Sequence, residues 1–245
     1  MATADGSWAV TETARASRTA VVPVEDANAV GFDTARLRVR FARDTSSLVI
    51  ADKDGETILA DAPGGGVELK GKGFTLAKAA PADEHYFGLG DKAAPLDRRG
   101  RTFTLWNTDA FGFQEGEDPL YKAIPYFIGF RNGRAFGLLL DNTYRSTWDF
   151  AQGDPEAVRF GADGGPIDYY VLAGPAPKDV TGAYAWLTGT APLPPMWSLG
   201  FRLPLSCGGL PRTSRRPTSR LPCCNSSVSK AGKARRLPGW TSSGC

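Results

Sequence analysis

Cysteine and histidine are nearly absent from most of this 245-residue chain. Residues 1–201 contain no cysteine, because all four cysteines lie after that point, and the whole chain has one histidine, His85. Residues 1–201 are therefore expected to form neither a disulfide nor a thiolate metal site. A single histidine is too few for a histidine-based metal cluster. We expect no metal and no cofactor.

Long apolar runs and a leader pattern are also missing. No segment approaches the roughly 18 apolar residues that a membrane-spanning helix needs. The N-terminal sequence MATADGSWAV has neither the basic start nor the apolar stretch of a secretory signal. If Met1 is the true start, these absences predict a cytoplasmic protein that has no membrane partner.

Acidic residues are absent from residues 202–245, which carry nine of the 29 lysines and arginines. Residues 1–201 then hold 20 basic and all 26 acidic residues, a net charge of −6, although the whole chain has a net charge of +3. Because the main part of the chain is acidic, its charge argues against a nucleic-acid partner.

Short segments with strand-like patterns fill the chain up to residue 172. Arg36–Phe41 alternates strictly between arginine and apolar residues, which is typical of a half-buried strand. Asn132-Gly133 separates two apolar runs and predicts a tight hairpin. Further strands are expected at 47–51, 57–60, 73–78, 86–90, 101–106, 124–130, 136–141, 146–150, 157–160 and 167–172. This succession favours a mainly β, antiparallel sandwich over alternating strands and helices.

The pattern changes after residue 175. Val180, Tyr184 and Leu187 share one face of an expected short helix, Val180–Thr188. Prolines 192, 194 and 195 end it, and Met196–Phe201 reads as a buried strand.

Residues 202–245 show no strand or helix period, and prolines interrupt any regular element. We considered a basic disordered arm that binds nucleic acid. A second interpretation, a metal-binding module, fails because the adjacent Cys223 and Cys224 do not have the paired CxxC spacing of metal ligands and the tail has no histidine. We favour out-of-frame translation of GC-rich coding sequence, which gives this mixture of Arg, Pro, Ser and Cys.

The stretch from Tyr86 to Phe130 contains the candidate site. Between its last two expected strands lies a loop with Asn107, Asp109, Phe111 and Tyr121. Aromatic rings stack on the apolar faces of sugars, and carboxylate or amide groups bind their hydroxyls. On residue types alone, an alternative is favoured in which the aromatics belong to the core and Asp109 caps a turn.

Residues from about 84 to 201 resemble glycoside hydrolase family 31, which includes α-glucosidases and α-xylosidases. Five blocks in the same order carry the resemblance: HYFGLGDK (85–92) with LDRRG (96–100), LWNTDA (105–110), DPLYKAIP (118–125), IDYY (167–170) and LPPMWSLGF (193–201). Residues from about 30 to 80 match more weakly.

This resemblance implies an N-terminal sandwich of the galactose-mutarotase type that precedes a catalytic (β/α)₈ barrel. It implies that Asp109 contacts sugar hydroxyls, with Asn107, Phe111 and Tyr121 as loop scaffold or rim, and that His85 is a strand-edge residue. Composition and resemblance together divide the chain into a weakly ordered N-terminus (1–30), the sandwich (31–175), a linker helix with the first barrel strand (176–201) and a disordered, out-of-frame tail (202–245).

In the family, a nucleophile and an acid/base carboxylate perform retaining hydrolysis. Both lie beyond position 201 in the family layout, so no catalytic residue is assigned. We therefore expect an inactive N-terminal fragment of an enzyme acting on α-linked glucosides or oligosaccharides. A stand-alone carbohydrate-binding module is the alternative, and a nucleic-acid binder acting through the basic tail is a third hypothesis.

Overall fold

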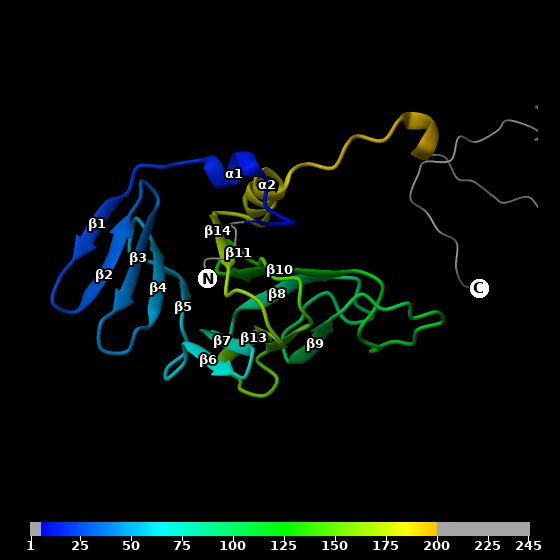
Figure 1. Cartoon of the computed structure of the whole chain (residues 1–245), viewed down its shortest axis with the longest axis horizontal. Coiled ribbons are helices and arrows are strands. Elements are labelled where there is room, and N and C mark those ends of the chain that lie inside the picture. The colour runs from blue at the N-terminus through cyan, green and yellow to red at the C-terminus, as the bar shows by residue number, and fades with distance from the viewer. Residues whose placement is uncertain (1–5, 200–245) are drawn as a thin grey trace, which may run out of the picture. The chain divides into compact units, whose positions relative to one another are not determined.

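The computed structural model describes residues 6–199 of the chain. The chain divides into two compact units, Met1–Pro192 and Leu193–Cys245. Within the described part of the first unit, the strands form three antiparallel sheets, here called A, B and C (Figure 1). The prediction of a mainly β, antiparallel fold is confirmed.

Sheet A is a five-stranded meander in which each strand pairs with the next along the chain. The expected strands at 36–41, 47–51 and 57–60 correspond to its last three. The first two were not predicted, because Pro23 in β1 and Gly31 in β2 interrupt their short apolar patterns. The strands are β1 (Val22–Glu25), β2 (Ala29–Asp33), β3 (Leu37–Ala42), β4 (Leu48–Asp52) and β5 (Thr57–Ala60).

Sheets B and C form the two layers of the sandwich. Phe127 of sheet C packs edge-on against Trp148 and Phe150 of sheet B, with ring centroids 5.9 and 5.2 Å apart. Sheet B has the order β6 (Val67–Lys70), β7 (Gly73–Ala79), β13 (Ala157–Ala162), β12 (Ser146–Phe150) and β9 (Arg101–Leu105). Sheet C has the order β14 (Tyr169–Gly174), β11 (Arg134–Leu140), β10 (Ala123–Arg131) and β8 (His85–Gly90).

Strand β11 is buried on both faces, as its apolar run predicts. Leu138 and Leu140 belong to the core between the sheets, whereas Leu139 packs with Val10 and Leu187 on the opposite face. The hairpin that joins β10 to β11 has positive φ at both Asn132 and Gly133, as a type I′ turn requires.

A buried ion pair links all three sheets. Lys78 Nζ on β7 lies 2.5 Å from Asp61 Oδ1, directly after β5, and donates to the hydroxyl of Tyr169 on β14 at 3.1 Å. The other carboxylate oxygen of Asp61 accepts from the backbone N–H of Leu48 at 2.8 Å. A charge this deeply buried is tolerated because it is paired and hydrogen-bonded.

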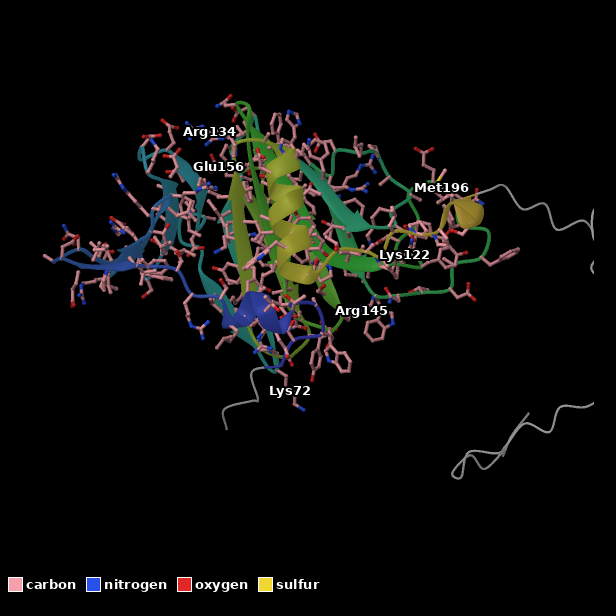
Figure 2. The ribbon with its side chains drawn as sticks, turned by 90° about the horizontal axis from the view of Figure 1, so that it is seen from above. Lys72, Lys122, Arg134, Arg145, Glu156 and Met196 are labelled. Atoms are coloured by element: carbon pink, nitrogen blue, oxygen red, sulfur yellow. The ribbon has the colours of Figure 1, made fainter. Side chains whose placement is uncertain are left out.

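Helix α2 (Pro177–Thr188) lies along the outer face of sheet C (Figure 2) and contacts β10, β11 and β14. Its predicted apolar face is confirmed: Val180 and Leu187 are buried, and Tyr184 stacks on Tyr126 with centroids 4.0 Å apart. No helix in the described residues is long and apolar enough to cross a membrane.

The N-terminal segment is more ordered than its sequence suggested. A second helix, α1 (Glu12–Ala16), was not predicted because it is short and has no buried face. Thr11 begins this helix, and its backbone N–H donates to the carbonyl of Leu187 at 3.0 Å. Together with β1 and β2, this contact makes residues 6–30 part of the first unit.

The predicted strand at Met196–Phe201 is wrong where the structure describes it. Met196–Leu199 forms a short 3₁₀ helix, η1, in which the Ser198 backbone N–H and hydroxyl donate to the Pro195 carbonyl at 2.9 and 2.8 Å. A strand needs a neighbouring strand for its backbone groups, and no other described residue pairs with this segment. The expected tail, 202–245, lies outside the described residues.

Candidate functional site

The candidate site lies in the loop 106–122, which joins β9 at the edge of sheet B to β10 in sheet C. Figure 1 shows this loop extending from the sandwich beyond the ends of the two strands. We call its two ends, where it meets β9 and β10, the base, and residues 109–115 the tip. The predicted loop between two strands is therefore confirmed.

A buried ion pair fixes the base. Lys92 Nζ is paired with a carboxylate oxygen of Asp118, and the other oxygen accepts from the backbone N–H of Thr104 on β9. Lys92 also donates to the Thr104 carbonyl at 2.7 Å, and only 1% of its side chain is exposed. Burial lowers the pKa of Lys92, while the carboxylate beside it favours the charged form.

Asn107 also belongs to the base. Its side-chain oxygen accepts from the backbone N–H of Ala123, at the start of β10, at 2.7 Å. The backbone N–H of Thr108 donates to the carbonyl of Leu120 at 3.0 Å, and Leu120 is buried. These bonds tie the outgoing and returning arms together, which supports the scaffold role expected for Asn107.

The tip contrasts with the base, because Asp109 and Phe111 are exposed. Phe111 has 96% of its surface open to solvent. Among residues 6–199, no hydrogen bond or ion pair involves the carboxylate of Asp109. The fold therefore leaves both side chains free to contact a ligand.

Phe113 in the tip and Tyr121 in the returning arm form a small aromatic pair. Their ring centroids lie 6.2 Å apart in an edge-on arrangement, and both rings are partly exposed. Tyr121 thus supports the returning arm of the loop while part of its ring remains accessible.

The motif Asp97-Arg98-Arg99-Gly100 has a structural role. Arg98 is buried and donates to the carbonyls of Gly88, Ala94 and Pro95. Arg99 donates to four further carbonyls before β9 begins. His85 is the first residue of the edge strand β8, and its Nδ1 atom lies 2.6 Å from Asp97 Oδ2. This agrees with the strand-edge position expected for His85.

Sequence reasoning missed the roles of Lys92 and Asp118. Both residues fall within the blocks of the resemblance, but their 26-residue separation gives no local signal that they meet. No cluster of His, Cys, Asp or Glu suited to holding a metal ion occurs in the part of the chain that the structure describes.

A family model identifies the fold. The model for the "Glycosyl hydrolase 31 N-terminal galactose mutarotase-like domain" matches residues 2–149, more than half of the chain. The chain belongs to glycoside hydrolase family 31. The family 31 resemblance of the sequence blocks and the galactose-mutarotase type of sandwich are thereby confirmed.

Similar proteins support this assignment. Alpha-glucosidase 2 of Bacillus thermoamyloliquefaciens is 45% identical over 62% of this chain and 19% of its own length. An alpha-glucosidase of Saccharolobus solfataricus is 33% identical over 55% of this chain and 19% of its own. The chain thus spans about a fifth of the length of these family 31 relatives.

A family 31 dextranase of Flavobacterium johnsoniae shares the fold. A mutant of it complexed with isomaltotriose superposes with a TM-score of 0.74 and 32% identity, over 80% of this chain and 24% of the dextranase. Another structure of the dextranase is complexed with glucose.

Proposed function

We propose that this domain is the N-terminal sandwich of a retaining α-glycosidase acting on α-linked glucosides, and that its β9–β10 loop supplies a sugar contact. One observation carries the proposal: the fold fixes the base of the loop and leaves the Asp109 carboxylate at the tip exposed and without a partner among the described residues. The alpha-glucosidase and dextranase relatives support the substrate class.

Each candidate residue has a distinct role in this proposal. Asp109 accepts hydrogen bonds from sugar hydroxyls, and Phe111 covers an apolar face of the ring. Asn107 and Tyr121 hold the two arms of the loop and form its rim. The bond from Ala123 to Asn107 and the packing of Phe113 on Tyr121 support this division of roles.

The hydrolytic step is assigned outside the described domain. Retaining hydrolysis needs a nucleophile and an acid/base carboxylate on either side of the glycosidic bond. By resemblance, both belong to the barrel that follows the sandwich in this family, and residues 202–245 contain no acidic residue. The 245-residue chain alone therefore binds sugar and does not hydrolyse it.

The remaining boundaries and surroundings also stay proposals. We place the end of the sandwich domain at 175, a linker at 176–201 and an out-of-frame segment at 202–245. The start predicted at residue 31 falls within β2 (Ala29–Asp33), so the domain begins earlier in the chain. The division of the chain at Pro192 supports a boundary within the linker. The net charge of −6 for residues 1–201 supports a neutral sugar over nucleic acid as the partner. A cytoplasmic location stays a prediction from the sequence.

A titration of the ¹⁵N-labelled 245-residue chain with isomaltotriose tests the loop assignment. Millimolar, saturable shifts are expected at the tip amides of Ala110 and Gly112, because one part of a sugar site binds weakly. Asp109→Ala should remove these shifts. Tip amides that do not move with isomaltotriose would contradict the loop assignment.

A chromogenic α-glucoside tests the hydrolytic assignment. Purified 1–245 should release no chromophore, because the proposed catalytic carboxylates are not among its residues. Turnover that follows the protein through purification would show that the hydrolytic assignment is wrong.

A further inference from the structure

A pocket of about 410 Å³ opens beside the base of the β9–β10 loop. Three segments that are far apart in the sequence line it: the N-terminal segment around Trp8, the base of the loop, and the connection between β11 and β12. Asp109 and Phe111 are not among its lining residues. Its volume is within the ~300–1,000 Å³ typical of ligand pockets. The pocket is thus distinct from the proposed contact at the tip.

Each of the three segments contributes an aromatic side chain. Trp8, Trp106 and Tyr144 line the pocket, and they expose 92%, 50% and 54% of their surfaces. Single exposed aromatics are common on protein surfaces, whereas several gathered around one pocket mark an interaction site. Three such residues around one pocket provide apolar faces on which a ring-shaped ligand can stack.

The ring of Tyr144 is held in place by two glycines. A Cβ atom on Gly164 would lie 2.9 Å from Tyr144 Cε1, and one on Gly165 would lie 2.8 Å from Cδ2. The ring therefore packs directly on the backbone of this turn, which a larger residue would prevent. Because the ring is still 54% exposed, its orientation is fixed while much of its surface stays accessible.

Asn142 joins the two loops that form this platform. Its Nδ2 donates to the carbonyls of Gly164 and Pro166 at 2.9 and 3.0 Å, and its Oδ1 accepts from the Tyr144 N–H at 2.8 Å. The backbone N–H of Asp163 donates to the Arg145 carbonyl at 2.9 Å and closes the same pair of loops. A platform ordered before binding loses less conformational entropy when a ligand arrives.

The polar groups of the pocket suit an uncharged ligand with hydroxyl groups. No lysine or arginine lines the pocket, so nothing there neutralises a phosphate or carboxylate. Asp141 lines it with a half-buried carboxylate that has no hydrogen bond or ion pair within residues 6–199. The Nδ2 of Asn107, another lining residue, has no acceptor among these residues. An acceptor and a donor are thus available beside the aromatic faces.

From this geometry we infer a second sugar-binding site, in which an α-linked gluco-oligosaccharide stacks on Tyr144 and Trp106. Its hydroxyls donate to Asp141 and accept from Asn107. The choice of α-glucoside as the sugar class rests on the proposed function, whereas the site itself rests on the pocket. The site gives the domain a second contact with the oligosaccharide, and this contact does not depend on Asp109.

The experiment is an isomaltotriose titration of the ¹⁵N-labelled full chain, read at the amides of Tyr144 and Gly164 and at the indole of Trp8. Tyr144→Ala should weaken binding at the remaining pocket signals about tenfold. Gly164→Ala should have a similar effect, because its methyl group displaces the Tyr144 ring while Tyr144 itself is retained. Gly164 is the better of the two glycines to change, since only Gly165 has a positive φ.

Trp186→Ala is the matched control. Trp186 on α2 is also an exposed aromatic, at 57%, but it does not line the pocket, so binding should be unchanged. The inference is overturned if the wild-type chain shows no saturable shifts at the pocket signals. It is also overturned if Tyr144→Ala and Gly164→Ala both bind like the wild type. Pocket shifts that persist in Asp109→Ala would support it.

The two proposals fail in different ways. If Asp109→Ala abolishes the tip shifts while Tyr144→Ala and Gly164→Ala both bind like the wild type, the pocket is wrong and the loop assignment stands. If Tyr144→Ala weakens the pocket shifts while the tip amides never respond, the loop assignment is wrong and the pocket stands.

Discussion

The base and the tip of the β9–β10 loop use similar polar residues for opposite purposes. At the base, Asp118 binds both the buried Lys92 and the Thr104 backbone, and Asn107 accepts from Ala123. At the tip, Asp109 is exposed and has no partner among the described residues. The contrast shows that an aspartate in a loop can be assigned to structure or to ligand binding only from its contacts. It predicts that substitutions at the base destabilise the domain more than substitutions at the tip.

The largest effect is expected at the base. Asp118→Ala leaves the Lys92 ammonium buried without a carboxylate and should lower the free energy of unfolding by about 3 kcal/mol. Urea denaturation measures the change. The double variant Lys92→Met, Asp118→Ala should recover part of the loss, because it removes the unpaired charge. A loss below about 1 kcal/mol in Asp118→Ala would show that the base is not fixed by this pair.

Glu84 shows what happens to a buried carboxylate that has no close cationic partner: burial outweighs the interaction with the Tyr86 hydroxyl, which lowers the pKa of the carboxyl group. It is 5% exposed, its nearest ion pair is Arg131 at 3.9 Å, and burial raises its pKa to about 7. The folded state therefore retains a proton that the unfolded chain releases near pH 4.5. Between these two values, the free energy of unfolding falls as the pH rises.

Glu84→Gln should remove this dependence, raising the free energy of unfolding at pH 8 by about 2 kcal/mol and changing it little at pH 4.5. Urea denaturation at both pH values provides the test. Asp83→Asn is the matched control, since Asp83 also lies 3.9 Å from Arg131 but is exposed. Equal changes at both pH values in Glu84→Gln would contradict the raised pKa.

A smaller effect is expected at Asn107. Asn107→Ala removes the acceptor for the Ala123 N–H and should cost about 1 kcal/mol of unfolding free energy. Asn107→Asp keeps an oxygen acceptor and should lose less. Thermal unfolding of the wild type and both variants measures the change. If Asn107→Ala is as stable as Asn107→Asp, this hydrogen bond contributes nothing to the base.

The smallest change in stability is expected at the tip. Asp109→Ala and Phe111→Ala should each shift the free energy of unfolding by less than about 0.5 kcal/mol, because both side chains are exposed. The same urea experiments report the values. A larger loss in Asp109→Ala would mean that Asp109 stabilises the loop, as the turn-capping alternative holds.

Much of the fold could be predicted because local patterns agree with the tertiary structure. The alternation at Arg36–Phe41, the Asn132-Gly133 turn and the apolar run of β11 each identified their elements. Edge strands β1 and β6 and helix α1 lack a buried face, so no period marks them. The segment Met196–Leu199 is apolar like a strand, but no described strand pairs with it.

The candidate site was predictable only in part, because its main contacts join residues that are far apart in the sequence. Flanking strands located the loop, and residue types with the family resemblance singled out Asp109. The pairing of Lys92 with Asp118 and the packing of Tyr144 on Gly164 join residues that are about 20 or more positions apart. No local period encodes such contacts, so the structure was needed to separate base from tip and to reveal the pocket.

The most direct test of the central claim is the dissociation constant for isomaltotriose reported by the Gly112 amide. Wild type, Asp109→Ala and Glu115→Ala form the matched set, because both substituted side chains are exposed acids of the same tip. We predict at least about tenfold weaker binding in Asp109→Ala, or roughly 1.4 kcal/mol, and no change in Glu115→Ala. Equal affinity in all three proteins would contradict the claim that this family 31 loop presents Asp109 to sugar.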